Sequence, residues 1–196
     1  MECEEKGILL VLSGPSGSGK NTVLDGLMEK DQAVRQTVSA TTRSPRPGEK
    51  DGVEYYFISR EAFDKRIENG EFLEYVRYGN NYYGTLRAEI DRLLAEKKKT
   101  ILVIEVNGAA NIKKVYPDAI TVFLMPPSDE VLRCRLCGRG EISEEEMATR
   151  MSIALEEVKH KEEYDYIVVN DVLEKAVDEV YTIMNRKIAQ NKESLQ

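Results

Sequence analysis

The stretch ILLVLSGPSGSGKNT, residues 8–22, decides the fold, because it joins an apolar run, a glycine-rich turn and the start of a helical pattern. Residues 8–12 are continuously apolar, as is typical of a parallel strand that is covered on both faces. After the turn, Val23, Leu24 and Leu27 recur at helical spacing. A glycine loop between a strand and a helix is the context in which the pattern G-x-x-x-x-G-K-[ST] predicts phosphate binding.

The loop follows this pattern at Gly14, Gly19 and Lys20 but has Asn21 where the pattern has a hydroxyl. Glycines let the main chain wrap around phosphates, and N–H groups at the helix start donate to the phosphate oxygens while the lysine adds a positive charge. The neutral oxygen of Asn21 predicts a weak Mg²⁺ ligand. Thr22 points about 100° away around the helix, so we do not expect it to replace the missing hydroxyl. The predicted ATP-binding residues of the loop are Gly14, Pro15, Ser16, Gly17, Ser18, Gly19, Lys20, Asn21 and Thr22.

The rest of the chain alternates apolar runs with helical patterns. The apolar runs are residues 100–104, 120–124 and 166–169, and the helical patterns are residues 87–96, 128–136, 144–158 and 173–188. This alternation predicts an α/β protein with a parallel β-sheet core between helices, the three-layer fold of P-loop NTPases. Turn formers and tyrosine-rich short strands interrupt it, which predicts a small mixed β lobe. We expect the core at 1–36, 86–136 and 159–196 and the mixed lobe at 37–85; the family resemblance described below implies that this lobe binds a nucleotide and that 137–158 form a short helical lid.

Composition restricts the function classes. The chain has 196 residues and a formal net charge of −7, with a pI near 5.0, which argues against nucleic-acid or anionic-membrane binding. The early apolar run is too short for a secretory signal or a membrane span, so we expect a cytoplasmic protein. Cys134 and Cys137 form a C-x-x-C pair without enough further ligands for zinc. They are therefore interpreted as reduced, structural thiols.

Five segments carry a family resemblance. They are SGPSGSGK, SATTRSPRPGEKDGVEYYF, GEFLEYVRYGNNYYGT, RGEISEEEMATRM and YDYIVVND, which extend from residue 13 to residue 171. In their order and spacing the chain resembles the guanylate kinase family, as a divergent member with Asn21 in the phosphate loop. The resemblance implies a P-loop kinase that transfers the γ-phosphoryl of ATP to GMP or dGMP with Mg²⁺, giving ADP and GDP or dGDP.

The lobe residues fit an acceptor nucleotide. Arg43 and Arg46 lie three apart in a proline-stiffened loop, where two guanidinium groups can bracket one phosphate. The resemblance implies that Glu74 accepts the N–H groups of guanine; adenine would leave that carboxylate without a donor. The GMP-binding residues that it implies are Ser39, Arg43, Arg46, Tyr55, Glu74, Tyr83, Thr85 and Glu105.

Further arginines match the lid of the family. Arg139 and Arg150 correspond to its lid arginines, and with Lys20 and Arg43 they form the implied catalytic set, because transferred phosphoryl oxygens need positive charge. The resemblance also places Arg135, Asn170 and Asp171 beside the donor ATP. Clustering like charges around one cleft costs free energy unless an anion neutralises them, which favours retained substrate binding.

The chain departs from the family at three further positions. Val103 lies where an acidic residue is usual, Glu105 replaces an aspartate, and Asn107 replaces a glutamine. Glu105 still provides a carboxylate that can reach a metal ion through water, or the acceptor base. Two alternatives therefore stay open: a catalytically weak guanylate-kinase-like module that binds a nucleotide or a protein, and a nucleoside monophosphate kinase with another acceptor preference. ATP and GMP or dGMP are the expected partners, and the sequence leaves monomer and homodimer equally open.

Overall fold

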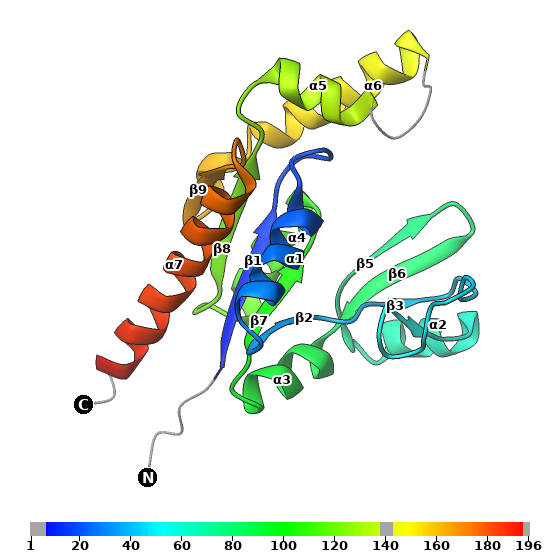
Figure 1. Ribbon diagram of the computed structural model, residues 1–196. Helices are drawn as coiled ribbons and strands as arrows, with labels where there is room; N and C mark the ends of the chain where they lie inside the picture. The colour runs from blue at the N-terminus through cyan, green and yellow to red at the C-terminus, as the bar shows by residue number, and fades with distance from the viewer. Residues whose placement is uncertain (1–6, 138–142, 194–196) are drawn as a thin grey trace.

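The computed structural model describes residues 7–137 and 143–193, and its core is a parallel sheet of five strands. The strand order is β2-β7-β1-β8-β9, and every neighbouring pair is parallel (Figure 1). The strands are β1 (Ile8–Ser13), β2 (Val34–Gln36), β7 (Lys99–Val103), β8 (Ile120–Met125) and β9 (Tyr166–Val169). Because β1 is the central strand, the glycine loop that follows it leaves the middle of the sheet.

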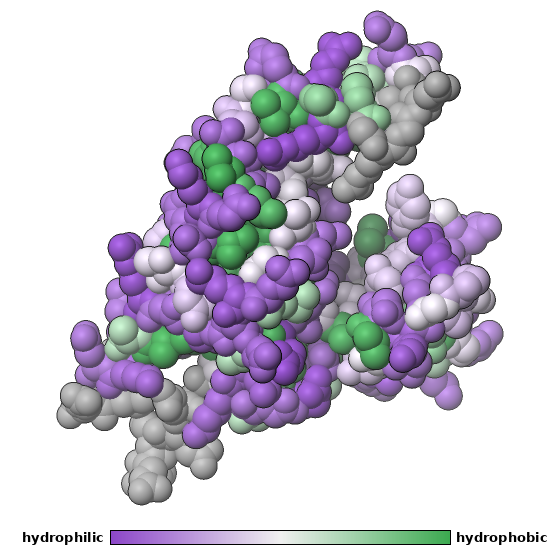
Figure 2. All heavy atoms as spheres, viewed as in Figure 1, coloured by the Kyte–Doolittle hydropathy of each residue, from purple (hydrophilic) through white to green (hydrophobic). Residues whose placement is uncertain are grey.

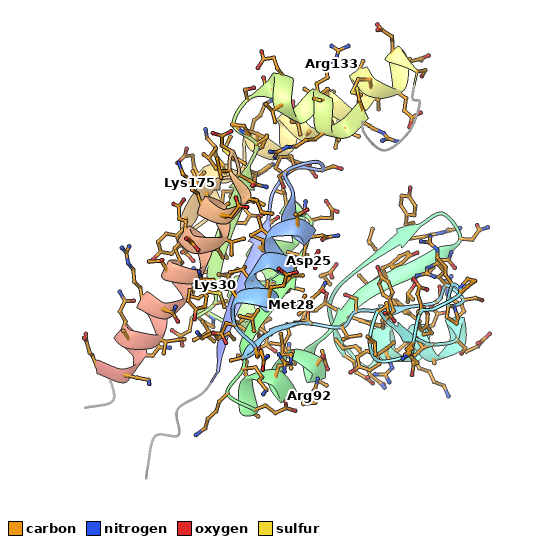
Figure 3. The ribbon with its side chains drawn as sticks, viewed as in Figure 1. Asp25, Met28, Lys30, Arg92, Arg133 and Lys175 are labelled. Atoms are coloured by element: carbon orange, nitrogen blue, oxygen red, sulfur yellow. The ribbon has the colours of Figure 1, made fainter. Side chains whose placement is uncertain are left out.

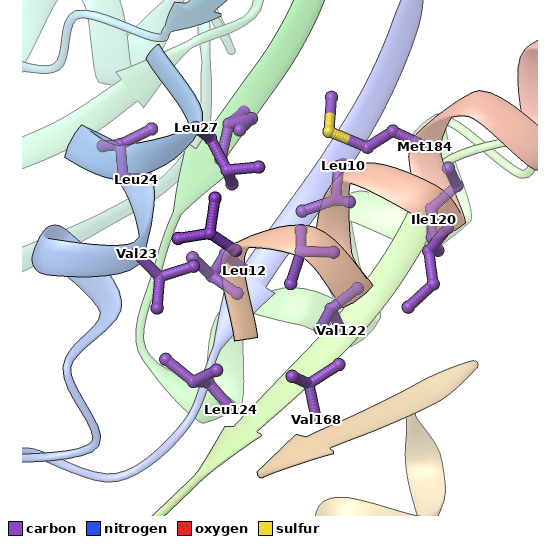
Figure 4. Close-up of a cluster of buried hydrophobic side chains, with 14 of the residues drawn as sticks. Leu10, Leu12, Val23, Leu24, Leu27, Ile120, Val122, Leu124, Val168 and Met184 are labelled. Atoms are coloured by element: carbon purple, nitrogen blue, oxygen red, sulfur yellow. The ribbon is translucent and has the colours of Figure 1, made fainter. Parts of the chain in front are cut away.

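Helices cover both faces of this sheet because successive side chains of β1 point to opposite sides. Leu10 and Leu12 belong to a buried cluster with residues of α1 (Lys20–Lys30) and α7 (Leu173–Glu193), and Figure 4 shows this cluster. Leu9 and Val11 pack on the other side against α3 (Arg87–Ala95) and α4 (Val106–Val115). The predicted three-layer α/β fold is therefore confirmed.

A second sheet forms the predicted mixed lobe. Its order is β4-β3-β6-β5, with one parallel pair and two antiparallel pairs. Its elements are β3 (Ala40–Thr41), β4 (Tyr56–Phe57), α2 (Arg60–Glu68), β5 (Phe72–Tyr78) and β6 (Asn81–Leu86). Phe63 of α2 is fully buried and stacks on Phe72, with 4.3 Å between the ring centroids. The lobe thus has a small core of its own, separate from the parallel sheet.

Two helices lie across the end of the parallel sheet where the glycine loop emerges (Figure 1). They are α5 (Asp129–Cys137) and α6 (Glu144–Val158), and a short 3₁₀ turn, η1 (Lys161–Glu163), follows them. Leu132 and Leu136 of α5 pack against Met147 and Ala154 of α6. The face of the molecule in Figure 2 is hollowed between these helices, the core and the mixed lobe. No helix within the described ranges is long and apolar enough to cross a membrane.

Candidate active site

The glycine loop is shaped by three glycines that hold positive φ angles. Gly14, Gly17 and Gly19 have φ angles of 142°, 87° and 94°, which other residues rarely adopt. A Cβ on Gly14 would lie 2.2 Å from the carbonyl oxygen of Leu124, and a Cβ on Gly19 would lie 2.4 Å from Nδ2 of Asn170. The loop therefore needs glycine at these positions both for its backbone conformation and for its close contacts.

Helix α1 begins at Lys20, directly after the loop. Its N-cap is Gly19, which has no side chain to cap the first N–H groups, so the positive end of the helix faces the loop. The Lys20 ammonium donates to the carbonyl oxygens of Gly14, at 2.6 Å, and Pro15, at 3.2 Å. Loop, helix start and lysine thus form one positively polarised site of the kind that binds phosphate. Asn21 is exposed in the first turn of the helix.

A cavity of about 360 Å³ opens beside the loop. Its lining residues are Gly17, Gly19, Thr22, Arg135, Asn170, Asp171 and Leu173. The cavity brings together the residues that sequence analysis assigned to the ATP side from three distant segments. Thr22, the residue after Asn21, also lines this cavity.

Asn170 and Arg135 are tied to the loop by hydrogen bonds. The buried Asn170 side chain donates from Nδ2 to the carbonyl oxygen of Ser18 at 2.8 Å. Arg135 donates from Nη2 to the Asn170 carbonyl oxygen at 2.9 Å. Figure 3 shows Arg133 pointing outward from α5, and residues two apart on a helix face opposite sides, so Arg135 points inward. Arg135 and Asn170 therefore brace the loop.

On the mixed lobe, Arg43 is held by a carboxylate that sequence analysis missed. Its Nη1 and Nη2 atoms donate to Glu49 at 2.8 and 2.9 Å, and Glu49 also accepts from the backbone N–H of Arg46 at 2.7 Å. The Arg43 guanidinium, with the Arg46 N–H, lowers the pKa of the Glu49 carboxyl to about 2. The Arg43 guanidinium also lies 5.4 Å from the ring centroid of Tyr55, whose ring meets that of Tyr83 edge-on at 5.8 Å. Arg43, Tyr55 and Tyr83 thus lie together, while the Arg46 side chain is exposed.

The predicted base-reading residues also meet. Glu74 and Thr85 are opposite each other in the β5–β6 pair, and Glu74 Oε1 accepts from the Thr85 hydroxyl at 2.7 Å. Ser39 directly precedes β3, whose first residue, Ala40, pairs with Gly84, the neighbour of Thr85 in the chain. Burial raises the pKa of the Glu74 carboxyl, the Thr85 hydrogen bond opposes the rise, and the like charge of Glu105 adds to it. Glu74 and Thr85 therefore form a hydrogen-bonded polar pair on the lobe.

Glu105 lies near carboxylates of both the mixed lobe and α6. It is exposed at the N-cap of α4, two residues after β7 ends, and its charge acts on both Glu74 and Glu157. Val103, the last residue of β7, is half-buried and packs against the core. Glu157 of α6, which sequence analysis also missed, lies near Ser16, Lys20 and Glu105.

The donor set limits how a metal ion could be held. Within residues 7–137 and 143–193, no group of three or more His, Cys, Asp or Glu side chains could hold one. Asn21 and Glu105 offer only neutral amide and carboxylate oxygens, the hard donors that Mg²⁺ takes. Mg²⁺ usually keeps water and substrate phosphates among its ligands, so these residues fit an ion that is bound together with a nucleotide.

The lid residues are only partly described. Arg150 of α6 donates from Nη2 to Oε1 of Glu146 at 2.5 Å. Arg139, the other predicted lid arginine, lies outside the described residues. Cys134 and Cys137 are free thiols, and both are exposed on α5, outside the buried core.

Comparisons with known proteins agree with this arrangement. The guanylate kinase family model matches residues 6–187. A guanylate kinase of Halalkalibacterium halodurans is 47% identical over 92% of this chain and 89% of its own length, and one of Lactococcus lactis subsp. lactis is 48% identical over 92% and 88%. The crystal structure of guanylate kinase from Anaplasma phagocytophilum aligns with a TM-score of 0.72 and 33% identity, over 95% of this chain and 89% of that chain. The chain therefore belongs to the guanylate kinase family.

Proposed function

We propose that the chain transfers the γ-phosphoryl group of ATP to GMP or dGMP, giving ADP and GDP or dGDP. Guanylate kinases are ATP:GMP phosphotransferases, and the chain is an enzyme of this family. The observation that carries the proposal for this site is its two-sided construction. A main-chain phosphate loop lies on the core, and an arginine–tyrosine group with a carboxylate–hydroxyl pair lies on the mixed lobe.

On the donor side, the loop amides and the start of α1 bind the ATP phosphates, and Lys20 follows the transferred group. Phosphoryl transfer adds negative charge to the equatorial oxygens, which a mobile ammonium can neutralise. The cavity beside the loop takes the adenosine part, bordered by Thr22, Asn170 and Asp171. Arg135 acts from its braced position on α5.

On the acceptor side, Arg43, Arg46, Tyr55 and Tyr83 bind the GMP phosphate. The bidentate contact between Arg43 and Glu49 supports this role, because two parallel N–H donors that bind a carboxylate can also bind two oxygens of a phosphate. A phosphate dianion carries more charge than the Glu49 carboxylate, so it can take over this guanidinium. Arg43 then moves from a protein anion to a substrate anion.

The base is read by Glu74, Ser39 and Thr85, with Glu105 nearby. Guanine presents two N–H donors to one carboxylate, whereas adenine presents an acceptor to it. Thr85 already donates to Oε1 of Glu74, and the carboxylate still has acceptor lone pairs on both oxygens for the two N–H groups of the base. The core-packed Val103 cannot supply the acidic group that the family usually has there, so we assign base recognition to the lobe.

Transfer is completed by Arg150, with Arg139 as the second lid arginine, while the lobes exclude water from the phosphoryl group. When Mg²⁺ is bound with ATP it would neutralise phosphate charge, and Asn21 and Glu105 would hold it directly or through water. We keep residues 1–36, 86–136 and 159–196 as the core, 37–85 as the GMP lobe and 137–158 as the lid. A cytoplasmic location, as a monomer or homodimer that binds neither nucleic acid nor membranes, completes the proposal.

A coupled assay of ADP release across a panel of nucleoside monophosphates, titrated with Mg²⁺, tests the proposal. We expect turnover with GMP and dGMP and at most trace turnover with AMP. GMP binding without turnover would support the module alternative, and preferred turnover of another monophosphate would support an altered acceptor. Both alternatives involve Asn21, which is exposed and replaces the hydroxyl residue that the loop pattern has at the metal contact.

A further inference from the structure

The proposed phosphoryl transfer makes no use of Cys134 and Cys137, two free and exposed thiols on α5. They lie three residues apart in the last turn of the helix, which ends at Cys137. At 100° per residue, Cys137 lies about 40° and Cys134 about 100° around the helix from Arg133. Arg133 points outward in Figure 3, so both thiols lie on the solvent side of α5. The third cysteine of the chain, Cys3, precedes the first residue that the structure describes.

The other side of the same turn packs against the phosphate loop. Leu136 is only 1% exposed, and its Cδ2 atom would lie 3.2 Å from a Cβ placed on Gly17. Arg135 donates from Nη2 to the carbonyl oxygen of Asn170 at 2.9 Å, and the Asn170 side chain donates to Ser18 of the loop at 2.8 Å. The two residues between the cysteines are therefore those through which the last turn of α5 contacts the ATP side.

A disulfide between Cys134 and Cys137 requires a change in the backbone of this turn. Residues i and i+3 of an α-helix have Cα atoms about 5 Å apart, which is within the range of disulfides. Their Cβ atoms, however, are about 5–6 Å apart, whereas a disulfide needs about 3.5–4.5 Å. The turn can distort here because the last carbonyl groups of a helix have no intrahelical partner. Since Arg135 and Leu136 lie between the bonded residues, the distortion moves them relative to the loop.

We propose that Cys134 and Cys137 are an oxidative modification site, at which a low-molecular-weight disulfide converts the thiol pair into an internal disulfide and thereby weakens ATP binding. The inference rests on the ATP side of the proposed function, to which it adds regulation. Distortion of the last turn of α5 shifts Arg135 away from the Asn170 carbonyl oxygen and so removes a brace of the loop. In a cytoplasmic protein such a disulfide is transient, as is usual for redox sensing.

The reaction is thiol–disulfide exchange in two steps. The thiolate of one cysteine attacks a sulfur atom of the small disulfide, forms a mixed disulfide and releases one small thiolate. The thiolate of the other cysteine then attacks the protein sulfur of the mixed disulfide, which closes the internal bond and releases the second small thiolate. Two electrons pass from the protein to the small disulfide, and the two protons that the cysteines lose are taken up by the released thiolates. Excess small thiol reverses both steps.

A redox titration of the full chain with glutathione tests the proposal. The reference chain is C3S, so that Cys134 and Cys137 are its only thiols. After equilibration at rising ratios of oxidised to reduced glutathione, free thiols are alkylated, and the intact mass counts alkylated thiols and glutathione adducts. Equilibrium dialysis measures the Kd for ATP and for GMP and requires no turnover. We expect the oxidised chain to lose both alkylation sites without bound glutathione, and its Kd for ATP to rise about fivefold or more.

The Kd for GMP is the internal control, because the mixed lobe has its own core. It is expected to stay within about twofold, and dithiothreitol is expected to restore ATP binding. The matched variants are C3S/C134S and C3S/C137S, each with one thiol that can take up glutathione but cannot form the internal bond. In oxidised glutathione we expect their Kd for ATP to stay within about twofold of its reduced value.

Several results would overturn the inference. They are two thiols that remain free in oxidised glutathione, glutathione adducts without the internal bond, an internal bond with an unchanged Kd for ATP, and an equal loss of GMP binding. Loss of ATP binding in the single-thiol variants would also overturn it, because modification of a thiol would then suffice. A chain whose Kd for ATP responds to oxidation but which does not phosphorylate GMP would instead count against the proposed acceptor and support the inference.

Discussion

Replacing Asn170 tests whether the ATP site depends on a side chain that braces the loop. Asn170 donates its amide N–H to the Ser18 carbonyl oxygen at 2.8 Å, and only 5% of the residue is exposed. Asn170→Ala removes the donor and leaves Ser18 with the 3.5 Å contact from Arg135, which is long for a hydrogen bond. Asn170→Asp keeps the size but sets a carboxylate oxygen against the carbonyl oxygen, so the attraction becomes a repulsion.

The size of the effect follows from burial. A buried carbonyl that loses its partner costs about 1–3 kcal/mol, and a chain of this length changes its melting temperature by about 2–4 °C per kcal/mol. We therefore expect Asn170→Ala to melt about 2–12 °C below the parent chain, and Asn170→Asp to melt no higher than the alanine variant. Because Ser18 lies within the loop, we also expect the KM for ATP to rise about tenfold or more, equivalent to about 1.4 kcal/mol.

Thermal unfolding and initial rates at varied ATP and GMP measure both effects. The KM for GMP serves as the internal control, because the acceptor residues lie on the separate mixed lobe. Asn185→Ala is the matched variant, since Asn185 also makes one side-chain hydrogen bond, to Lys99, but far from the loop. A stable Asn170→Asp variant with the parental KM for ATP would refute the reasoning. It would mean that the amide nitrogen does not face Ser18.

Three further outcomes are expected. Arg43→Ala should lower kcat/KM for GMP about 100-fold, as loss of a charge-assisted bidentate contact implies, and leave the KM for ATP within twofold; equal changes in both would remove Arg43 from the acceptor site. Asn21→Ser should reach half-maximal rate at several-fold less Mg²⁺ if the metal contact limits turnover, and an unchanged Mg²⁺ titration would locate the limit elsewhere. The Lys99 hydrogen bond lowers the pKa of the Asp31 carboxyl below 3.8, so its stabilisation is present above that pH and lost as the pH falls through the lowered value. Asp31→Asn should then melt lower than the parent at pH 7, and the difference should shrink in acid.

The sheet and most helices were predictable because their sequences carry strong local patterns. Strand β1 is a continuous apolar run whose alternate residues fill two different clusters. The bounds of α6 were predicted correctly because Ser143 caps the helix by accepting from the Glu146 N–H at 3.1 Å, a signal readable from sequence. Helix α4 and strand β2 were missed. Helix α4 contains Gly108 near its start, and β2 has only three residues, so neither gives a clear pattern.

The candidate site was predictable in its members but not in their partners. The family motifs identified Glu74 and Thr85 as candidate site residues, and in the structure a hydrogen bond joins them. The partner of Arg43 is Glu49, six residues away across a turn, and glutamates in such loops are usually solvated. Glu157 offered a weak signal, because it lies seven residues after Arg150 on one helical stripe. What a buried carboxylate touches depends on how distant elements pack, and local sequence does not carry that information.

The protein's own acceptors already pair with the cations of the site. From sequence, a cluster of cations implied an external anion, because like charges repel in a shared cleft. In the structure, Arg43 already has Glu49, Arg150 has Glu146, and Lys20 has two loop carbonyls. The cations alone therefore do not require a ligand. Substrate phosphates must instead displace these protein acceptors. Each arginine therefore contributes to the binding free energy only the difference between its contact with the substrate and its contact with the protein. Modest ground-state binding of this kind favours turnover, since an interaction accelerates the reaction only where it is stronger in the transition state.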